Sequence, residues 1–312
     1  MIDDKRDHVY SGEIDFQELL RVVWEGRFLI TLVTGLAATL SVALALSMPN
    51  IYQSTATLAP KSDGETGGLS QLAAQYSGLA SLAGIRLSGV DGGGMSKSAI
   101  ALEKMKSLFF FERHLYEDVL LDLMAATSWD SVDRKIEYDD ELYDVTAKNW
   151  LRDVAPPLQV RPSAQEAHLE FLKVFSVSED KQTGLILVSV EHLSPDVAKH
   201  WVELIVQRVS EDLRAEDILE AENAIKFLGV QREKTSLLTL DEVFAQLIEE
   251  QTKVIMLANV SKNYVFNVID PPVAPELKMK PSRALISLIG ALVGAMFGVS
   301  LVIFRHYISW DE

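Results

Sequence analysis

Two long apolar blocks without any charge lie near the two ends of the sequence. The first runs from Phe28 to Met48 and the second from Ala284 to Phe304, and neither contains Asp, Glu, Lys or Arg. A helix rises 1.5 Å per residue, so about 21 residues reach roughly the 30 Å of a bilayer's hydrocarbon core. The pattern therefore predicts two transmembrane helices. A cleaved signal peptide is disfavoured for the first block because mostly polar residues precede it.

Positive charges predict the orientation of the two spans. Arg21 and Arg27 flank the start of the first span, whereas the nearest base after it is Lys61. Because Lys and Arg are retained in the cytoplasm, the first span predicts cytoplasmic termini. The bases before the second span argue weakly against this, but long translocated segments largely escape the charge rule.

This orientation divides the chain into cytoplasmic tails, spans and one periplasmic domain. Aromatic rings that favour the headgroup level, Trp24, Tyr307 and Trp310, stand at the cytoplasmic end of each span. The predicted tails are 1–27 and 305–312, the spans are 28–48 and 284–304, and the periplasmic domain is 49–283.

The second span carries glycines at a spacing of four: Gly290, Gly294 and Gly298. Two consecutive GxxxG steps remove side chains from one helix face, which lets another helix approach closely. We expect a helix-packing face here, although glycine is also tolerated in spans without such a role. The small residues of the first span, in this chain or in a neighbouring one, are a plausible partner surface: Thr34, Gly35, Ala37, Ala38 and Ser41.

Alternation and β-branched residues predict four strands between the spans, which together form a small mixed sheet. The second and third flank a polar turn that ends at Gly184 and are expected to form an antiparallel hairpin. The predicted strands are Ile51–Leu58, Phe171–Val177, Leu185–His192 and Tyr264–Ile269.

Helical periodicity predicts one helix over Ser96–Ala126 and a long helical hairpin over about 194–262. Ser194, Pro195 and Asp196 are typical of a helix start. The chain is expected to reverse near 235–239, where a capping box begins a second, coiled-coil-like helix. The predicted fold class is α+β, membrane-anchored, with two transmembrane helices flanking this periplasmic domain.

Three polar stretches carry candidate chemistry. The glycine clusters of 62–94 favour a flexible loop, although Leu69–Ala83 has helical apolar spacing, and no phosphate-binding motif closes them. The acidic residues of Trp129–Trp150 favour a solvated face over a metal site. Those of Glu211–Glu222 also favour solvent, with glycan hydroxyls or a neighbouring protomer's bases as alternatives.

Composition removes several classes of function. The net charge of −16 and the absence of a basic footprint exclude a duplex nucleic-acid partner. Without cysteine there is no disulfide, Cys-ligated metal or thiol nucleophile. The sequence has no HExxH or GxSxG motif. We therefore expect no catalytic, cofactor-binding or metal site.

Several segments together resemble the Wzz-type chain-length determinants, the class without a kinase domain. They are the two spans, the exit strand IYQSTATLAP, the helix start SPDVAKHWVELIV and the segment VIDPPVAPELKMKPSRA, which runs into the glycine-spaced span. This family comprises polysaccharide co-polymerases of Gram-negative inner membranes. Its proline-rich membrane-proximal signature falls on Pro271, Pro272, Pro275, Pro281 and Arg283, and its glycines on Gly290, Gly294 and Gly298. Arg283 replaces the expected lysine.

The resemblance implies a function. In the family, a periplasmic α/β base with a long protruding helix assembles into a ring beside the polysaccharide polymerase and sets the modal length of the lipopolysaccharide O-antigen. The implied protein is non-catalytic and needs no cofactor. Its implied partners are other copies of itself and the integral-membrane polymerase, with the growing glycan as a further candidate.

Three alternatives stay open on the sequence. One is a co-polymerase for capsule or exopolysaccharide export, although the eight residues after the second span predict no fused kinase. The others are a two-span periplasmic sensor and a periplasmic adaptor of an efflux pump. The short predicted tails leave no room for a sensor's signalling module, and an adaptor normally needs only one membrane anchor.

Overall fold

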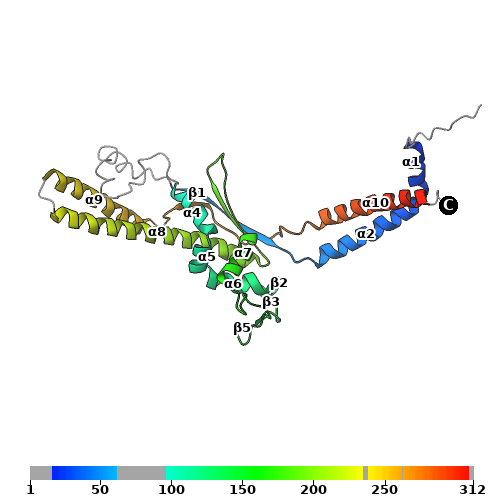
Figure 1. Ribbon diagram of the computed structural model, residues 1–312, viewed down its shortest axis with the longest axis horizontal. Coiled ribbons are helices and arrows are strands. Elements are labelled where there is room, and N and C mark those ends of the chain that lie inside the picture. The colour runs from blue at the N-terminus through cyan, green and yellow to red at the C-terminus, as the bar shows by residue number, and fades with distance from the viewer. Residues whose placement is uncertain (1–15, 62–95, 235–237, 262, 309–312) are drawn as a thin grey trace, which may run out of the picture. The chain divides into compact units, whose positions relative to one another are not determined.

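The computed structural model describes residues 16–61, 96–234, 238–261 and 263–308. The predicted glycine-rich loop with its helical spacing at 69–83 lies outside these residues. The chain forms two compact units. The first combines 1–50 with 279–312, and the second is 51–278 (Figure 1).

The first unit consists of helices. They are α1 (Phe16–Glu25), α2 (Arg27–Ser47) and α10 (Arg283–Ile308). Within the described residues, two helices are long and apolar enough to cross a membrane, over Arg27–Ser47 and Arg283–His306. They coincide with the two apolar blocks of the sequence. The amphipathic helix α1 has no counterpart among the elements that we predicted.

The second unit contains a sheet with the order β6-β7-β1-β8. Its strands are β1 (Tyr52–Pro60), β6 (Phe175–Glu179), β7 (Ile186–His192) and β8 (Phe266–Asp270). Every pairing is antiparallel, with Tyr52 opposite His192 between β1 and β7, and Leu58 opposite Val268 between β1 and β8. The expected mixed sheet is therefore antiparallel, because β7 and β8 both run opposite to β1.

The predicted hairpin forms, but its first strand begins later than expected. Phe171 belongs to helix α7 (Ala164–Val174), and β6 starts only at Phe175. The start of α7 was missed, although Ser163 and Glu166 have capping-box spacing; the Ser163 hydroxyl accepts a hydrogen bond from Glu166 N at 3.2 Å. The hairpin turn ends at Gly184, whose φ of +67° suits glycine.

The single helix expected over 96–126 is three helices. They are α4 (Lys97–Lys106), α5 (Leu108–His114) and α6 (Tyr116–Ala125). The first break comes at Ser107, whose side chain caps the start of α5 by accepting a hydrogen bond from Phe110 N at 3.2 Å. The second break comes at Leu115, between α5 and α6. Apolar periodicity continued across the Ser107 cap, so the pattern alone did not show the first break.

The acidic region Trp129–Trp150 folds into two small antiparallel hairpins. The first is β2 (Ala126–Asp130) with β3 (Lys135–Tyr138), and the second is β4 (Tyr143–Asp144) with β5 (Asn149–Trp150). The Asp144 carboxylate accepts hydrogen bonds from two backbone amides of its own turn. Turn formation thus accounts for part of the acidic composition.

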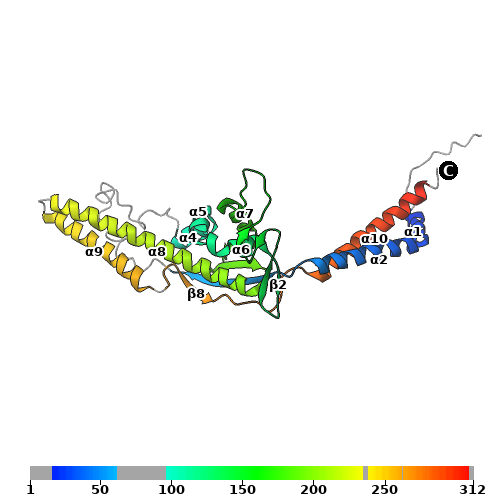
Figure 2. The same cartoon turned by 90° about the horizontal axis from the view of Figure 1, so that it is seen from below.

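The long helical hairpin is confirmed as part of the fold. Helix α8 spans Pro195–Lys234 and α9 spans Leu238–Val260. The two helices lie side by side in both views (Figures 1 and 2). At its beginning α8 also packs on β1 and β7, so one helix serves both the sheet and the hairpin.

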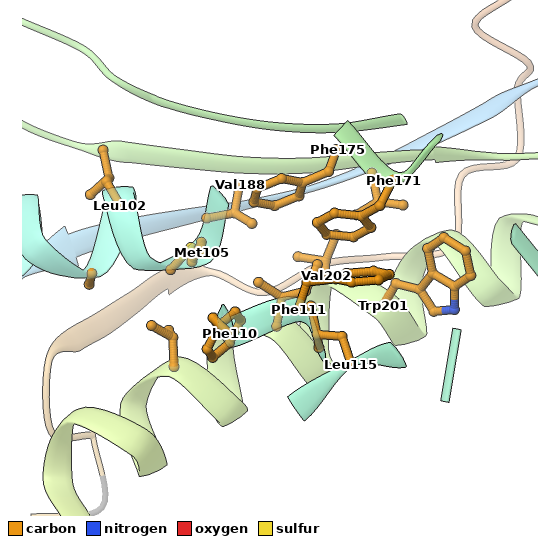
Figure 3. Packing of buried hydrophobic residues seen from close by; sticks show 14 of the residues in the cluster. Leu102, Met105, Phe110, Phe111, Leu115, Phe171, Phe175, Val188, Trp201 and Val202 are labelled. Carbon is orange, nitrogen blue, oxygen red and sulfur yellow. The ribbon is translucent and has the colours of Figure 1, made fainter. Parts of the chain in front are cut away.

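The core of the second unit lies between the sheet, the start of α8 and helices α4–α7 (Figure 3). Phe171 stacks on Phe175 with ring centroids 4.9 Å apart, and Phe111 lies 5.0 Å from Phe171. Trp201 of α8 is buried in the same cluster. These apolar contacts hold the base on which the polar groups described below are placed.

Candidate functional site

The glycines of α10 face α2 of the same chain. A Cβ atom placed on any of them would fall inside, or at the limit of, normal contact with α2. It would lie 2.3 Å from Ser41 Cβ for Gly290, 2.5 Å from Ala37 Cβ for Gly294, and 3.1 Å from Ile30 Cα for Gly298.

This order of contacts makes α2 and α10 antiparallel neighbours. At the other end of the pair, a Cβ on Gly26 would lie 2.4 Å from Val302. Of the two partners that the sequence left open, the structure shows the first span of the same chain. Gly35, which we counted as part of the partner surface, has no described atom within 4 Å of an added Cβ and faces elsewhere.

Arg283 joins the beginning of α10 to the end of the first span. Its Nη2 donates a hydrogen bond to Oδ1 of Asn50 at 3.2 Å. Pro281 lies two residues earlier, also in the first unit. The signature residue Arg283 thus has a bonding role in this unit.

The prolines of the linker belong to the second unit. Pro271, Pro272 and Pro275 follow β8 in backbone without regular secondary structure, and Pro272 is buried. The Ser54 hydroxyl of β1 donates a hydrogen bond to the Val273 carbonyl at 2.8 Å. The proline-rich segment therefore keeps following β1 beyond the end of β8.

A cluster of ion pairs joins α4 and α5 to α8. Lys104 Nζ lies 2.6 Å from carboxylate oxygens of both Asp212 and Glu216. His114 Nε2 lies 3.0 Å from Asp212, and Lys97 Nζ lies 2.8 Å from an oxygen of the next acid along α8, Asp217. The prediction that Glu211–Glu222 is a solvated face is therefore wrong for Asp212 and Asp217, which are largely buried and paired with bases far away in the sequence. Glu216 is paired with Lys104, but its side chain stays 57% exposed.

The pKa values within this cluster reflect the pairing. Partial burial opposes ionisation of Asp212, but the hydrogen bond and charge of Lys104, with His114 beside it, hold the pKa of its carboxyl below the ordinary 3.8. Burial likewise opposes the charge of Lys104, yet its two carboxylate partners raise its pKa above 10.5. Both groups are therefore charged at neutral pH.

Tyr264 extends the cluster toward β8. Its hydroxyl donates a hydrogen bond to the Asp217 carboxylate, and the Lys97 ammonium lies 5.2 Å from the centroid of its ring. Burial and this hydrogen bond raise the pKa of Tyr264 to about 12. Sequence reasoning missed these partners, since nothing in local periodicity links Tyr264 to Asp217, 47 positions away, or to Lys97, 167 positions away.

His192 is a packing histidine. Nδ1 accepts a hydrogen bond from Ser194 N at 3.0 Å, which leaves Nε2 to donate to the Asp122 carbonyl at 3.2 Å. Its ring centroid lies 5.0 Å from that of Trp201. Burial lowers its pKa below 6.5, so the neutral form is favoured. Among the described residues, no group of three or more His, Asp or Glu side chains could hold a metal ion.

Comparison with known proteins gave two family matches. The model of the chain length determinant protein family, Wzz, matches residues 12–107. The model of a G-rich domain on putative tyrosine kinase matches residues 236–307, which include the proline-rich segment and the glycines of α10. No curated protein sequence matches the chain.

Solved structures of similar proteins include co-polymerases. A full-length bacterial polysaccharide co-polymerase is 12% identical, with a TM-score of 0.42, covering 95% of this chain and 98% of that one. A fragment of WzzB, a polysaccharide co-polymerase from Salmonella Typhimurium, is also 12% identical, with a TM-score of 0.31, covering 74% of this chain and 100% of the fragment. The family match at residues 12–107 confirms the resemblance of this chain to the Wzz chain-length determinants.

Proposed function

We propose that this protein regulates the chain length of the lipopolysaccharide O-antigen, without catalysing a reaction, in the inner membrane of a Gram-negative bacterium. The match to the chain length determinant family carries the proposal. In this role the protein acts as a ring of identical subunits beside an integral-membrane polymerase. The growing glycan is a further candidate partner.

Deleting the gene and separating the surface polysaccharide on a gel tests whether the O-antigen is the polymer whose chain length this protein regulates. The proposal expects the modal length of the O-antigen ladder to be lost and then restored by the wild-type gene. An unchanged ladder would contradict it. A normal O-antigen ladder with altered capsule or exopolysaccharide would favour the alternative polymer, for which the match to the G-rich domain on putative tyrosine kinase is the supporting observation.

The proposed topology places 1–27 and 305–312 in the cytoplasm and 49–283 in the periplasm. Antiparallel packing supports two ends on one side, because Gly26 lies beside Val302 at one end of the pair and Gly290 lies beside Ser41 at the other. An alkaline phosphatase reporter fused after Glu312 is expected to be inactive. Activity there would mean a periplasmic carboxyl terminus and would contradict this topology.

The proposed assembly uses the helical hairpin. Large apolar side chains are exposed on the single chain along α8 and α9, which supports contact with further copies, and these are Leu219, Phe227, Val230, Met256 and Val260. Mass measurement of the detergent-solubilised protein is expected to give an oligomer. A monomer would argue against a ring. The double substitution Phe227→Ser and Val230→Ser is expected to shift the measured mass toward that of a monomer.

A role for the signature residues is also part of the proposal. We expect the prolines at 271, 272, 275 and 281, with Arg283, to transmit the arrangement of the periplasmic domain to α10. Complementation of the deletion strain with Arg283→Ala, which loses the hydrogen bond to Asn50, is expected to shorten the modal length. A wild-type ladder would remove Arg283 from this role.

A further inference from the structure

Helix α1 has one apolar and one polar face. In its sequence, FQELLRVVWE, the apolar positions recur at helical spacing, and the polar positions 17, 18, 21 and 25 fall together on the other side. On the polar side, Arg21 and Glu25 form an exposed ion pair, with Nε 3.4 Å from Oε1. Val22 and Val23 are half-buried. The helix is therefore amphipathic and separate from the uniformly apolar α2.

A turn at Gly26 joins α1 to the first span. The Gly26 amide donates to the Val22 carbonyl at 2.9 Å, and the Leu29 amide donates to the Gly26 carbonyl at 3.0 Å. Helix α1 contacts α10, and both views show it running across the axis of the α2–α10 pair (Figures 1 and 2). The short turn and the contact with α10 hold α1 against the end of the two candidate spans.

The residues at this turn suit a boundary between lipid and water. Trp24 is 71% exposed and Phe28 is 80% exposed. The Arg27 guanidinium carbon lies 5.8 Å from the centroid of the Trp24 ring and 6.0 Å from that of Phe28. A cation beside aromatic rings, at the end of an apolar helix, is the arrangement favoured at the headgroup level.

The charge of α1 indicates whether anionic lipid or apolar burial would attract this helix to a membrane. Its ionisable side chains are Glu18, Arg21 and Glu25, so it has no excess of bases for anionic lipid to attract. Burial of the apolar face of α1 is therefore the remaining source of affinity for a membrane.

We propose that α1 lies in the plane of the membrane interface, with its apolar face at the boundary of headgroups and acyl chains, held by apolar burial and not by anionic lipid. The inference rests on the membrane anchoring of the proposed function, because it needs α2 and α10 to span.

The absence of cysteine in the chain allows single spin labels without a background. The full-length protein would be reconstituted in phosphatidylcholine vesicles with one label at a time, at Val23→Cys on the apolar face, Arg21→Cys on the polar face, or Leu36→Cys within α2. Collision rates with oxygen and with a water-soluble nickel chelate give the depth of each label. We expect the Val23→Cys label about 5–10 Å below the headgroup boundary, the Arg21→Cys label in water and the Leu36→Cys label near the bilayer centre.

Each other outcome has its own meaning. If Leu36→Cys is deep but Val23→Cys and Arg21→Cys are equally wet, α1 is not interfacial and membrane anchoring stands. If Leu36→Cys is wet, both the anchoring and the inference fail. If Val23→Cys is shielded from both oxygen and nickel, a protein covers this face, which overturns the lipid proposal.

Changing the lipid composition of the vesicles distinguishes apolar burial from electrostatic attraction to anionic lipid. The three depths are expected to stay unchanged when phosphatidylglycerol is added to the vesicles. A Val23→Cys label that inserts only in the anionic vesicles would overturn the proposed apolar mode of binding.

Discussion

Lys104 Nζ lies 2.6 Å from Oδ2 of Asp212, and this contact ties α4 to the middle of α8. The lysine side chain is 14% exposed and the aspartate 12%, so water screens the pair only weakly. Lys97 and His114 add further contacts between the same layers. In the acidic stretch of α8, Asp212 and Asp217 thus belong to a structural surface, whereas Glu211, Glu216, Glu220 and Glu222 are exposed.

Replacing the lysine of this pair is expected to destabilise the protein. In Lys104→Met, Asp212 loses its closest positive partner while most of its surface stays buried, and breaking a buried pair in this way costs roughly 3 kcal/mol of the free energy of unfolding. Urea denaturation of the detergent-solubilised protein, followed by tryptophan fluorescence, measures the loss.

Lys173→Met is the matched control. Its partner Glu170 is one helical turn away, and both side chains are largely exposed. The change is expected to stay within about 0.5 kcal/mol. Equal losses in the two variants would mean that burial of the Lys104 pair has no energetic weight.

Stability is expected to fall on the acid side of neutrality. The pKa of His192 is below 6.5 and that of Asp212 is below 3.8 in the folded protein. Each group therefore contributes stability that is complete above its ordinary pKa and is lost as pH falls toward its folded value. The pKa of Lys97 and of Lys104 is raised above 10.5, so their contributions are lost only as pH rises through the folded value. Melting temperatures between pH 3 and pH 11 test this.

His192 is expected to account for the first part of that acid loss. Below pH 6.5 the unfolded chain binds a proton that the buried ring resists, so His192→Gln is expected to flatten the dependence of melting temperature on pH between 7 and 5.5. The exposed His200 gives the control. The idea fails if His200→Gln flattens the slope as much as His192→Gln.

Neighbouring phenylalanines of α5 are expected to respond very differently to truncation. Phe111 is fully buried against Phe171, so Phe111→Ala is expected to cost about 3–5 kcal/mol of the free energy of unfolding. Phe109 is 62% exposed, and Phe109→Ala is expected to cost no more than about 0.5 kcal/mol. Equal costs would contradict the orientation of α5.

Widening the glycine face is expected to separate the two candidate spans. Gly294→Val would place atoms onto Ala37 and the backbone at Thr34, and such overpacking costs about 1–3 kcal/mol. Gly35→Val, where an added Cβ meets no described atom within 4 Å, is the matched control. The melting temperature in detergent should fall for Gly294→Val only. A wild-type value for Gly294→Val would mean that the pair does not pack through this face.

Local patterns predicted the elements whose evidence lies within one segment. The apolar blocks, the strands at 51–58 and 185–192, and the reversal after about 40 helical residues all follow from the spacing of apolar and polar positions. The same reasoning failed at Phe171. That residue was assigned to a strand, but it is the last-turn core residue of a helix that begins at the Ser163 cap.

The sequence by itself determined where the chain is apolar enough to span a membrane and where it forms a long helical hairpin, because periodicity and caps act between neighbouring residues. Only the tertiary structure decided that Asp212 meets Lys104 and that Gly290 meets Ser41. These contacts join residues more than 100 positions apart, and their energy exists only after the intervening chain has folded and brought the two surfaces together.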